Sequence, residues 1–441
     1  MNHWMTMAVG LFALGTAGTA HAATDAELQD ALETMQQQLS TQQQQIQELK
    51  DRLAKQQTAP IAVAKDDAAT VRLKPGPEIT SADGKTVFAL DGRVTMDAGW
   101  VGNDDADLGD AADIRYLWLG TKGKVGDWGY RLLAGLENDS TDIKDAFVSY
   151  HGFNNVMLQA GNFKEFNGIE NMSSNLHNTF LERSSGVSTF RPLRRLGVGG
   201  TVNGERWTLQ VGAFGDDTGN TAADDEGYSY TGRLFAAPIL DAANNHVLHV
   251  GGAVRYQVPD ADDDSIRYRS RGESHVIDAQ LVDTGVITAV DHTETYSAEA
   301  YYTHGPLALM AEYNIVSVDR DGLDDPSFQG GYVNASYFLT GEQREYKLNN
   351  GTYGRVKPKN PLTRDGSGYG AWEVAGRYTY LDLTDEGILG GEMDSYTLGV
   401  NWYPTSFTKF MLNYVINETD EDATTPNNDP HYLMLRAQVD F

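Results

Sequence analysis

His431-Tyr-Leu-Met-Leu-Arg-Ala-Gln-Val-Asp-Phe441, the last eleven residues of the chain, alternate between two kinds of side chain. Successive side chains of a β-strand point to opposite faces, so one face here would carry Leu, Leu, Ala and Val, and the other Met, Arg, Gln and Asp. A strand with one apolar and one charged face suits a closed transmembrane barrel, which has lipid outside and water inside. Taken alone, the segment is also compatible with an ordinary edge strand.

The other end of the chain, residues 1–22, is predicted to be a signal peptide. Ala8-Val-Gly-Leu-Phe-Ala-Leu-Gly15 is an apolar segment, and Ala20-His-Ala22 matches an A-x-A cleavage site. The preceding residues depart from the usual pattern, because they contain His3 but no Lys or Arg. We expect the chain to be exported; a short buried helix is the alternative.

Residues 23–57 are predicted to form a periplasmic α-helical coiled coil. Leu32, Leu39, Ile46 and Leu53 repeat every seven residues. A second series with the same spacing, apolar except for two Gln, is offset from the first by four residues: Leu28, Met35, Gln42, Leu49 and Gln56. This a/d pattern favours a parallel homo-oligomer, most simply a trimer, with two Gln layers in its seam. A lone amphipathic helix is the alternative. Residues 58–85 contain Pro60, Pro75 and Pro77 and are predicted to be a linker.

Residues 86–441 are predicted to form a 16-stranded antiparallel transmembrane β-barrel, so the fold class is all-β. Short turns such as Asn203-Gly-Glu205 alternate with longer acidic loops, and the spacing of about 22 residues per strand suits a porin. No apolar run of about eighteen residues follows residue 22, so no transmembrane helix is expected. The candidate strands are 86–101, 113–123, 128–138, 142–152, 154–163, 194–203, 205–215, 228–237, 246–258, 293–304, 306–318, 330–340, 369–382, 393–403, 405–417 and 431–441.

Much of the net charge of −28 comes from acidic residues in the longer loops and therefore lies on one rim of the predicted barrel. Acidic side chains at that rim could bind lipopolysaccharide through divalent cations, or could simply keep solvated loops soluble. The expected location is the outer membrane of a Gram-negative cell. The expected partners are outer-membrane lipid and lipopolysaccharide, and no nucleic acid.

No residues form a recognisable catalytic motif. The chain has no Cys, no G-x-S-x-G and no H-E-x-x-H, and its ten His are scattered. We expect no enzyme activity, no cofactor and no metal site. A Ser/His/Asp set assembled from distant strands is the alternative.

Five arginines are expected to face the lumen, because Arg on the lipid face of a barrel is costly near the midplane. They lie on the strand faces opposite the aromatic residues and are partly offset by acids on the same faces, such as Glu299 and Glu312. The five are Arg93, Arg131, Arg255, Arg377 and Arg436.

Residues 164–195 form a long insert with more apolar residues than an exposed loop needs. Such a segment could fold against the inner wall and narrow the pore. Arginine binds oxyanions through a planar fork of donors, and rings of Arg or Lys give pores anion selectivity. The expected anion-binding residues here are Ser173, Ser174, Arg183, Arg191, Arg194 and Arg195.

The alternative is that these arginines pair with Glu165, Glu170 and Glu182 and only hold the loop in place. A second insert, Arg355-Val-Lys-Pro-Lys-Asn-Pro361, is locally basic. Its Lys357 and Lys359 could reach the pore from the periplasmic side, or could merely solvate a long turn.

Several motifs resemble the phosphate-selective porins of Gram-negative outer membranes, the porin O and P type. They are Ser173-Ser-Asn-Leu-His-Asn-Thr-Phe-Leu-Glu-Arg-Ser184, Tyr337-Phe-Leu-Thr-Gly-Glu342, Gly354-Arg-Val-Lys-Pro-Lys-Asn-Pro361, and Gly399-Val-Asn-Trp-Tyr-Pro404 followed by Asn413-Tyr-Val415. The resemblance covers roughly residues 86–441. It implies a homotrimer with inward-folded loops and an arginine ladder leading to a site for phosphate or polyphosphate. Ser173, Ser174 and Arg183 match the family motif, as do Lys357 and Lys359.

Two features depart from the family pattern, namely the strongly acidic loops and the N-terminal coiled coil. Our hypothesis is a trimeric outer-membrane porin for passive, anion-preferring uptake of phosphate or polyphosphate. The alternatives are a general or sugar-type porin, and a structural tether between outer membrane and cell wall.

Overall fold

The computed structural model describes residues 69–73, 76–102, 108–137, 140–215, 226–241, 243–260, 264–420 and 429–441. Six residues of the N-terminal segment are also described, and all six are helical and exposed: Gln37, Ser40, Thr41, Gln43, Gln44 and Gln47. Residues 1–65 and 66–441 are separate compact units. The predicted signal peptide and nearly all of the predicted coiled coil lie outside the described residues and stay predictions.

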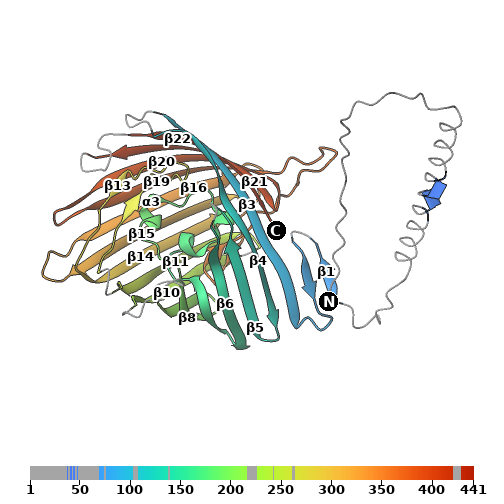
Figure 1. Cartoon of the computed structure of the whole chain (residues 1–441), viewed down its shortest axis with the longest axis horizontal. Coiled ribbons are helices and arrows are strands. Elements are labelled where there is room, and N and C mark those ends of the chain that lie inside the picture. The colour runs from blue at the N-terminus through green and yellow to red at the C-terminus, as the bar shows by residue number, and fades with distance from the viewer. Residues whose placement is uncertain are drawn as a thin grey trace, which may run out of the picture. The chain divides into compact units, whose positions relative to one another are not determined.

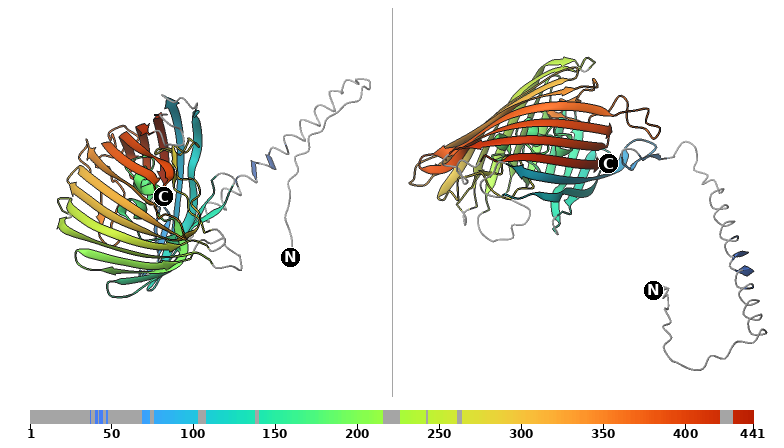
Figure 2. Two further views of the ribbon diagram at one scale, coloured as in Figure 1. Left: turned by 90° about the vertical axis from the view of Figure 1, so that its left-hand side faces the viewer. Right: turned by 90° about the horizontal axis from the view of Figure 1, so that it is seen from above.

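Sixteen antiparallel strands close into a barrel, which confirms the predicted barrel fold (Figures 1 and 2). Each predicted strand overlaps one observed strand. The strands are β3 (Thr86–Gly102), β4 (Ala111–Val125), β5 (Trp128–Gly135), β6 (Asp142–Phe153), β7 (Val156–Lys164), β8 (Arg194–Asn203), β9 (Trp207–Phe214), β10 (Tyr228–Asp241), β11 (His246–Val258), β14 (Val290–His304), β15 (Leu307–Arg320), β16 (Ser327–Phe338), β19 (Ala371–Asp385), β20 (Ile388–Thr405), β21 (Thr408–Thr419) and β22 (His431–Asp440).

The C-terminal strand has the two faces that its sequence predicts. Leu433, Leu435 and Val439 are exposed on the outside, whereas Arg436 and Asp440 are buried inside. Strand β22 pairs with β3 and so closes the barrel. No helix among the described residues is long and apolar enough to cross a membrane.

The described part of the predicted linker contains secondary structure. Two short strands, β1 (Thr70–Arg72) and β2 (Glu78–Thr80), pair with each other, and β2 also pairs with β3. The sequence pattern missed them because each is three residues long, too short to show an alternation.

Of the connections that the structure describes, three fold into the barrel. One of them is the loop between β7 and β8 (residues 165–193), here called the third loop. It contains α2 (Ile169–Met172), the 3₁₀ turn η1 (Asn175–His177) and α3 (Ser185–Ser188). The fifth loop, described from residue 264 to 289, contains β12 (Arg269–Ser270) and β13 (Val282–Asp283). The turn insert (residues 339–370) enters from the opposite rim and contains β17 (Tyr346–Lys347) and β18 (Thr352–Tyr353).

An apolar core inside the barrel holds the third and fifth loops against one wall. Phe190 of the third loop packs on Tyr268 of the fifth loop, and Tyr268 packs on Phe328 of β16. Leu381 of β19 and Val415 of β21 belong to the same cluster. Burial of these side chains offsets the entropy lost when long loops become ordered. Figures 1 and 2 show α3 enclosed by the strands.

Candidate anion site in the barrel lumen

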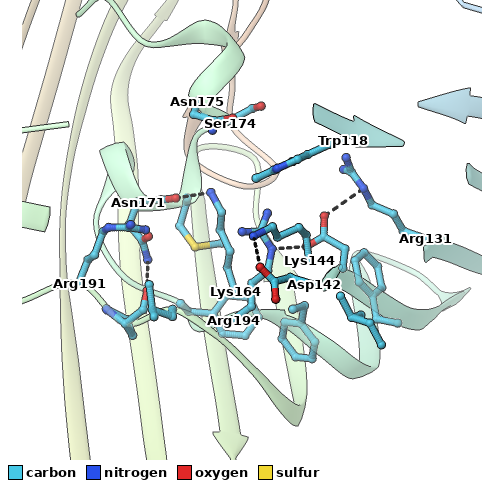
Figure 3. A pocket seen from close by; sticks show the side chains of 18 of the residues that line it. Trp118, Arg131, Asp142, Lys144, Lys164, Asn171, Ser174, Asn175, Arg191 and Arg194 are labelled. Carbon is cyan, nitrogen blue, oxygen red and sulfur yellow. Dashed lines mark hydrogen bonds and ion pairs between the residues drawn. The ribbon is translucent and has the colours of Figure 1, made fainter. Parts of the chain in front are cut away.

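A cavity of about 550 Å³ lies between the third loop and the inner faces of strands β3 to β9 (Figure 3). Eight basic side chains line it, against three acidic ones, so its charge is opposite in sign to that of the whole chain. The basic residues are Arg93, Arg115, Arg131, Lys144, Lys164, Arg183, Arg191 and Arg194, and the acidic residues are Glu137, Asp142 and Asp145.

Four of the eight basic side chains are neutralised by carboxylates. Arg115 donates to Glu182 in a bidentate pair at 2.9 and 3.0 Å. Arg194 donates to Asp145 at 2.6 Å, and Arg131 lies 3.1 Å from the same carboxylate while also donating to Asp91. Lys144 lies 3.4 Å from Glu137 and 3.3 Å from Asp142.

The other four have no carboxylate within 4.0 Å among the described residues. Arg93 donates to the side-chain oxygen of Asn175, and Lys164 donates to the carbonyls of Asn171 and Ser173. Arg183 donates to the carbonyl of Glu170 at 3.0 Å and of Ser173 at 3.2 Å. Neutral carbonyl partners leave the positive charge of these groups uncompensated.

Of these four groups, Arg191 has the least complete hydrogen bonding. Its Nε is buried and has no hydrogen-bond partner in the described part of the chain. Burial, together with the charge of Arg183, lowers the pKa of Arg191 to about 10, so the guanidinium is still charged at neutral pH. A desolvated cation without a partner is costly, and an entering anion would relieve that cost.

A second cavity of about 300 Å³ lies between the third and fifth loops. Arg115, Arg183 and Arg191 line both cavities and therefore stand at their junction. The second cavity is also lined by two further arginines and four serines: Arg269, Arg271, Ser185, Ser188, Ser270 and Ser274. The fifth loop belongs to the rim of long loops, so the two cavities follow one another from that rim into the barrel.

Trp118 of β4 organises the cations of the larger cavity. The guanidinium carbon of Arg93 lies 4.3 Å from the ring centroid and that of Arg194 lies 5.4 Å away. The Lys144 ammonium is 5.5 Å from the same ring, and the indole N–H donates to Glu137 at 3.0 Å. Cation–π attraction at a buried ring is worth up to about 2 kcal/mol, so Trp118 helps to keep these charges close together.

The predicted anion-binding residues separate into two groups. Ser174, Arg183, Arg191 and Arg194 line the larger cavity, as do the predicted lumenal residues Arg93 and Arg131. Ser173 is fully buried instead, and its hydroxyl accepts a hydrogen bond from the Tyr353 amide of the turn insert at 3.4 Å.

The remaining predicted anion-binding residues are not brought to the cavity. Arg195 pairs with Glu165 at 3.1 Å. Lys357 is 73% exposed and lies 3.7 Å from Glu345, and the Lys359 ammonium donates to the Gly341 carbonyl. Neither lysine lines either of the two cavities.

The other three predicted lumenal arginines hold the inward loops. Arg255 makes a bidentate pair with Glu165 at 2.9 and 3.1 Å. Arg377 donates to Glu273 of the fifth loop, and Arg436 donates to Asp97 at 2.6 Å and to Glu182 at 2.8 Å. The loop carboxylates therefore pair mainly with arginines of the barrel wall. Within the described ranges, this leaves Arg183 and Arg191 of the third loop without an acidic partner.

Sequence reasoning missed Arg115, Lys144, Lys164 and Trp118. Lys164 is the first residue of the predicted insert, where no sequence pattern distinguishes it from a surface lysine. Arg115 was hidden by a β-bulge, because the register of β3 and β4 shifts between Thr95 and Asp97 and breaks the alternation. The two-faced pattern also assigns aromatic residues to the outside, whereas Trp118 points inward.

A closed 16-stranded barrel with an arginine-lined cavity in its lumen is the architecture of an outer-membrane porin. The chain belongs to the family of phosphate-selective porins O and P, whose family model matches residues 88–441. It is 30% identical to an uncharacterised protein of Caulobacter vibrioides, over 99% of this chain and 96% of that one. It is 28% identical to Porin O of Pseudomonas aeruginosa, over 81% of this chain and 89% of that one.

Solved structures agree on the fold. The anion-selective porin from Comamonas acidovorans superposes with a TM-score of 0.52 at 12% identity, over 81% of this chain and all of that one. The trimer form of OmpT from Vibrio cholerae gives a TM-score of 0.52 at 10% identity, over 81% and 99% of the two chains. Identities this low establish the barrel alone, whereas the family and the fold together point to a channel rather than an enzyme.

Proposed function

We propose that this outer-membrane porin is a passive, anion-preferring channel for phosphate or polyphosphate. The observation that carries the proposal is a group of four cations in one cavity that have no carboxylate partner in the described part of the chain: Arg93, Lys164, Arg183 and Arg191. The description of the family as phosphate-selective supports the proposal, as does the structural similarity to the anion-selective porin from Comamonas acidovorans.

Arg183 and Arg191 are the proposed constriction, because they line both cavities. Their donors and the Ser174 hydroxyl would replace part of the hydration shell of an entering anion. Arg115 and Arg194 would position the site rather than bind, since each is already paired with a carboxylate. Binding must stay weak enough for the anion to leave, so selectivity would come from successive sites rather than from one tight site.

Single-channel recording of the purified protein in planar bilayers tests this function. In a chloride gradient the reversal potential should show anion preference, and added phosphate should block the chloride current. Arg191→Gln should raise the half-blocking phosphate concentration about tenfold, because one charge-assisted donor group is lost.

Arg364→Gln is the matched control, since Arg364 is an exposed arginine of the turn insert. It should leave the phosphate block unchanged. A wild-type channel that prefers cations and ignores phosphate contradicts the proposal, and equal effects of the two substitutions contradict the assigned constriction.

We further propose that the protein is a homotrimer that contacts lipopolysaccharide through divalent cations. The trimer form of the Vibrio cholerae OmpT barrel supports the first part. For the second part, Asp291, His292 and Asp319 lie at the rim of long loops with potential ligand atoms within 4.8 Å of one another. Native mass spectrometry of full-length protein, purified with and without a chelator, measures both the copy number and the retained lipopolysaccharide.

A further inference from the structure

The larger cavity has an apolar surface beside its cations. Phe147 of β6, Met157 of β7 and Met172 of α2 line it and are partly exposed to it. Phe147 pairs across the sheet with Arg131, and Met172 lies between the two residues whose carbonyls hold Lys164. Cationic donors and apolar side chains therefore lie side by side in the lining of this cavity.

Packing accounts for only part of this apolar surface. Phe163, Phe166 and Phe214 form a buried cluster that holds the third loop to the wall, with ring centroids 5.1 to 6.4 Å apart. Phe147 and Met172 pack at the edge of this cluster but keep surface toward the cavity. Apolar surface left in contact with water costs free energy, so it often marks a ligand-binding surface.

Inorganic phosphate would gain no binding energy from that apolar surface, because a strongly hydrated oxyanion is recognised by hydrogen-bond donors and positive charge. The volume of about 550 Å³ is also far more than one tetrahedral oxyanion needs and lies in the range of sites for small organic ligands.

We propose that the preferred ligands of this cavity are amphipathic organic anions, with one phosphate, carboxylate or sulfonate group on an aromatic or branched aliphatic body. The inference rests on the proposed anion-channel function and names its substrate class. The anionic group would bind Arg183, Arg191 and Lys164, and the body would lie on Phe147, Met157 and Met172.

Two phosphate monoesters with the same anionic group test the substrate class. Methyl phosphate and phenyl phosphate are compared as blockers of chloride current through the full-length protein in planar bilayers, at about pH 8, where both are dianions. Burial of one face of a phenyl ring should make phenyl phosphate effective at about tenfold lower concentration. Equal half-blocking concentrations overturn the proposed substrate class and leave the anion channel standing. Absence of block by both esters, with cation preference, overturns the channel function as well.

Strand β6 supplies a matched pair of variants, because Phe147 lines the cavity and Phe153 is 55% exposed at the end of the same strand. The tenfold preference for the phenyl ester should fall below threefold in Phe147→Ala and persist in Phe153→Ala. Met172→Ala, with the outward-facing Met96 changed to Ala as its control, gives a second readout should Phe147→Ala fail to fold. A full tenfold preference in Met172→Ala and in every folded Phe147→Ala preparation overturns the proposal.

Discussion

At the scale of single residues, the ion pairs inside the barrel join positions that are far apart in the chain. Arg255 and Glu165 are 90 residues apart, and Arg436 and Glu182 are 254 apart. Each pair ties a strand of the wall to the third loop. Removing one partner of such a pair is costly because the other charge stays desolvated.

Glu182 gives a pH prediction. Burial alone would raise the pKa of its carboxyl, but Arg115 and Arg436 overcome that effect and hold the pKa well below the usual value. The ionised form therefore stabilises the docked third loop above the unfolded pKa of about 4.3, and the stabilisation is lost as the pH falls toward the folded pKa. We expect the single-channel conductance to be constant from about pH 8 to pH 5 and to change below about pH 4.

Glu182→Gln should show at pH 7 the conductance that the wild type reaches only in acid. Glu205→Gln is the control, because Glu205 is exposed in a short turn. If the wild-type conductance instead changed near pH 6, a titratable group other than Glu182 would be responsible.

At the scale of elements, the third loop lies against the wall through a contact between two backbones. A Cβ atom on Gly186 of α3 would lie 2.3 Å from the Gly331 nitrogen and 2.6 Å from the Tyr380 carbonyl oxygen. A Cβ on Gly330 would lie 2.9 Å from the Gly186 Cα. No side chain fits between α3 and the sheet, so glycine at these positions sets the depth of the loop.

Gly186→Val should push α3 away from the wall. We expect a loss of about 1–3 kcal/mol of stability, typical of overpacking, together with a changed conductance. The loss of stability is measured as thermal unfolding, monitored by the heat-dependent gel mobility of the barrel. The conductance is measured by bilayer recording.

Gly232→Val is the control for Gly186→Val, because the nearest atom to its added Cβ would be 3.8 Å away, on Val254. An unchanged melting temperature and conductance in Gly186→Val would show that the loop has another resting position.

At the scale of the whole molecule, Phe441 lies at the seam where β22 pairs with β3 and the barrel closes. The Phe441 amide donates to the Gly92 carbonyl at 3.0 Å, and the Gly92 amide donates back to Phe441 at 3.0 Å. The Phe441 ring covers Gly92, where an added Cβ would lie 2.4 Å from the ring.

Gly92→Leu should displace the Phe441 ring and weaken the contact between β22 and β3. We expect a lower yield of folded barrel and a lower melting temperature, measured by gel mobility before and after heating. Gly376→Leu is the control, because its nearest neighbour would be 3.8 Å away, on Leu398. Equal stability of the two variants would contradict a role of Phe441 in closure.

The sequence by itself determined the barrel, because the alternation of side chains is local backbone geometry and needs no knowledge of partners. The C-terminal strand shows this directly, with Arg436 inside and Leu435 outside. The alternation fails where the strand is irregular, as at the β-bulge that turns Arg115 inward.

Only the tertiary structure decided which charges are available to an anion. Ion pairing depends on distances between segments that are remote in the chain. The sequence therefore could not show that Arg377 and Arg436 are paired, while Arg191 has no carboxylate partner among the residues that the structure describes. It likewise could not show that Ser173 is buried against the turn insert while Ser174 faces the cavity. Two adjacent serines differ in this way because the loop packs against a segment that begins more than 150 residues later.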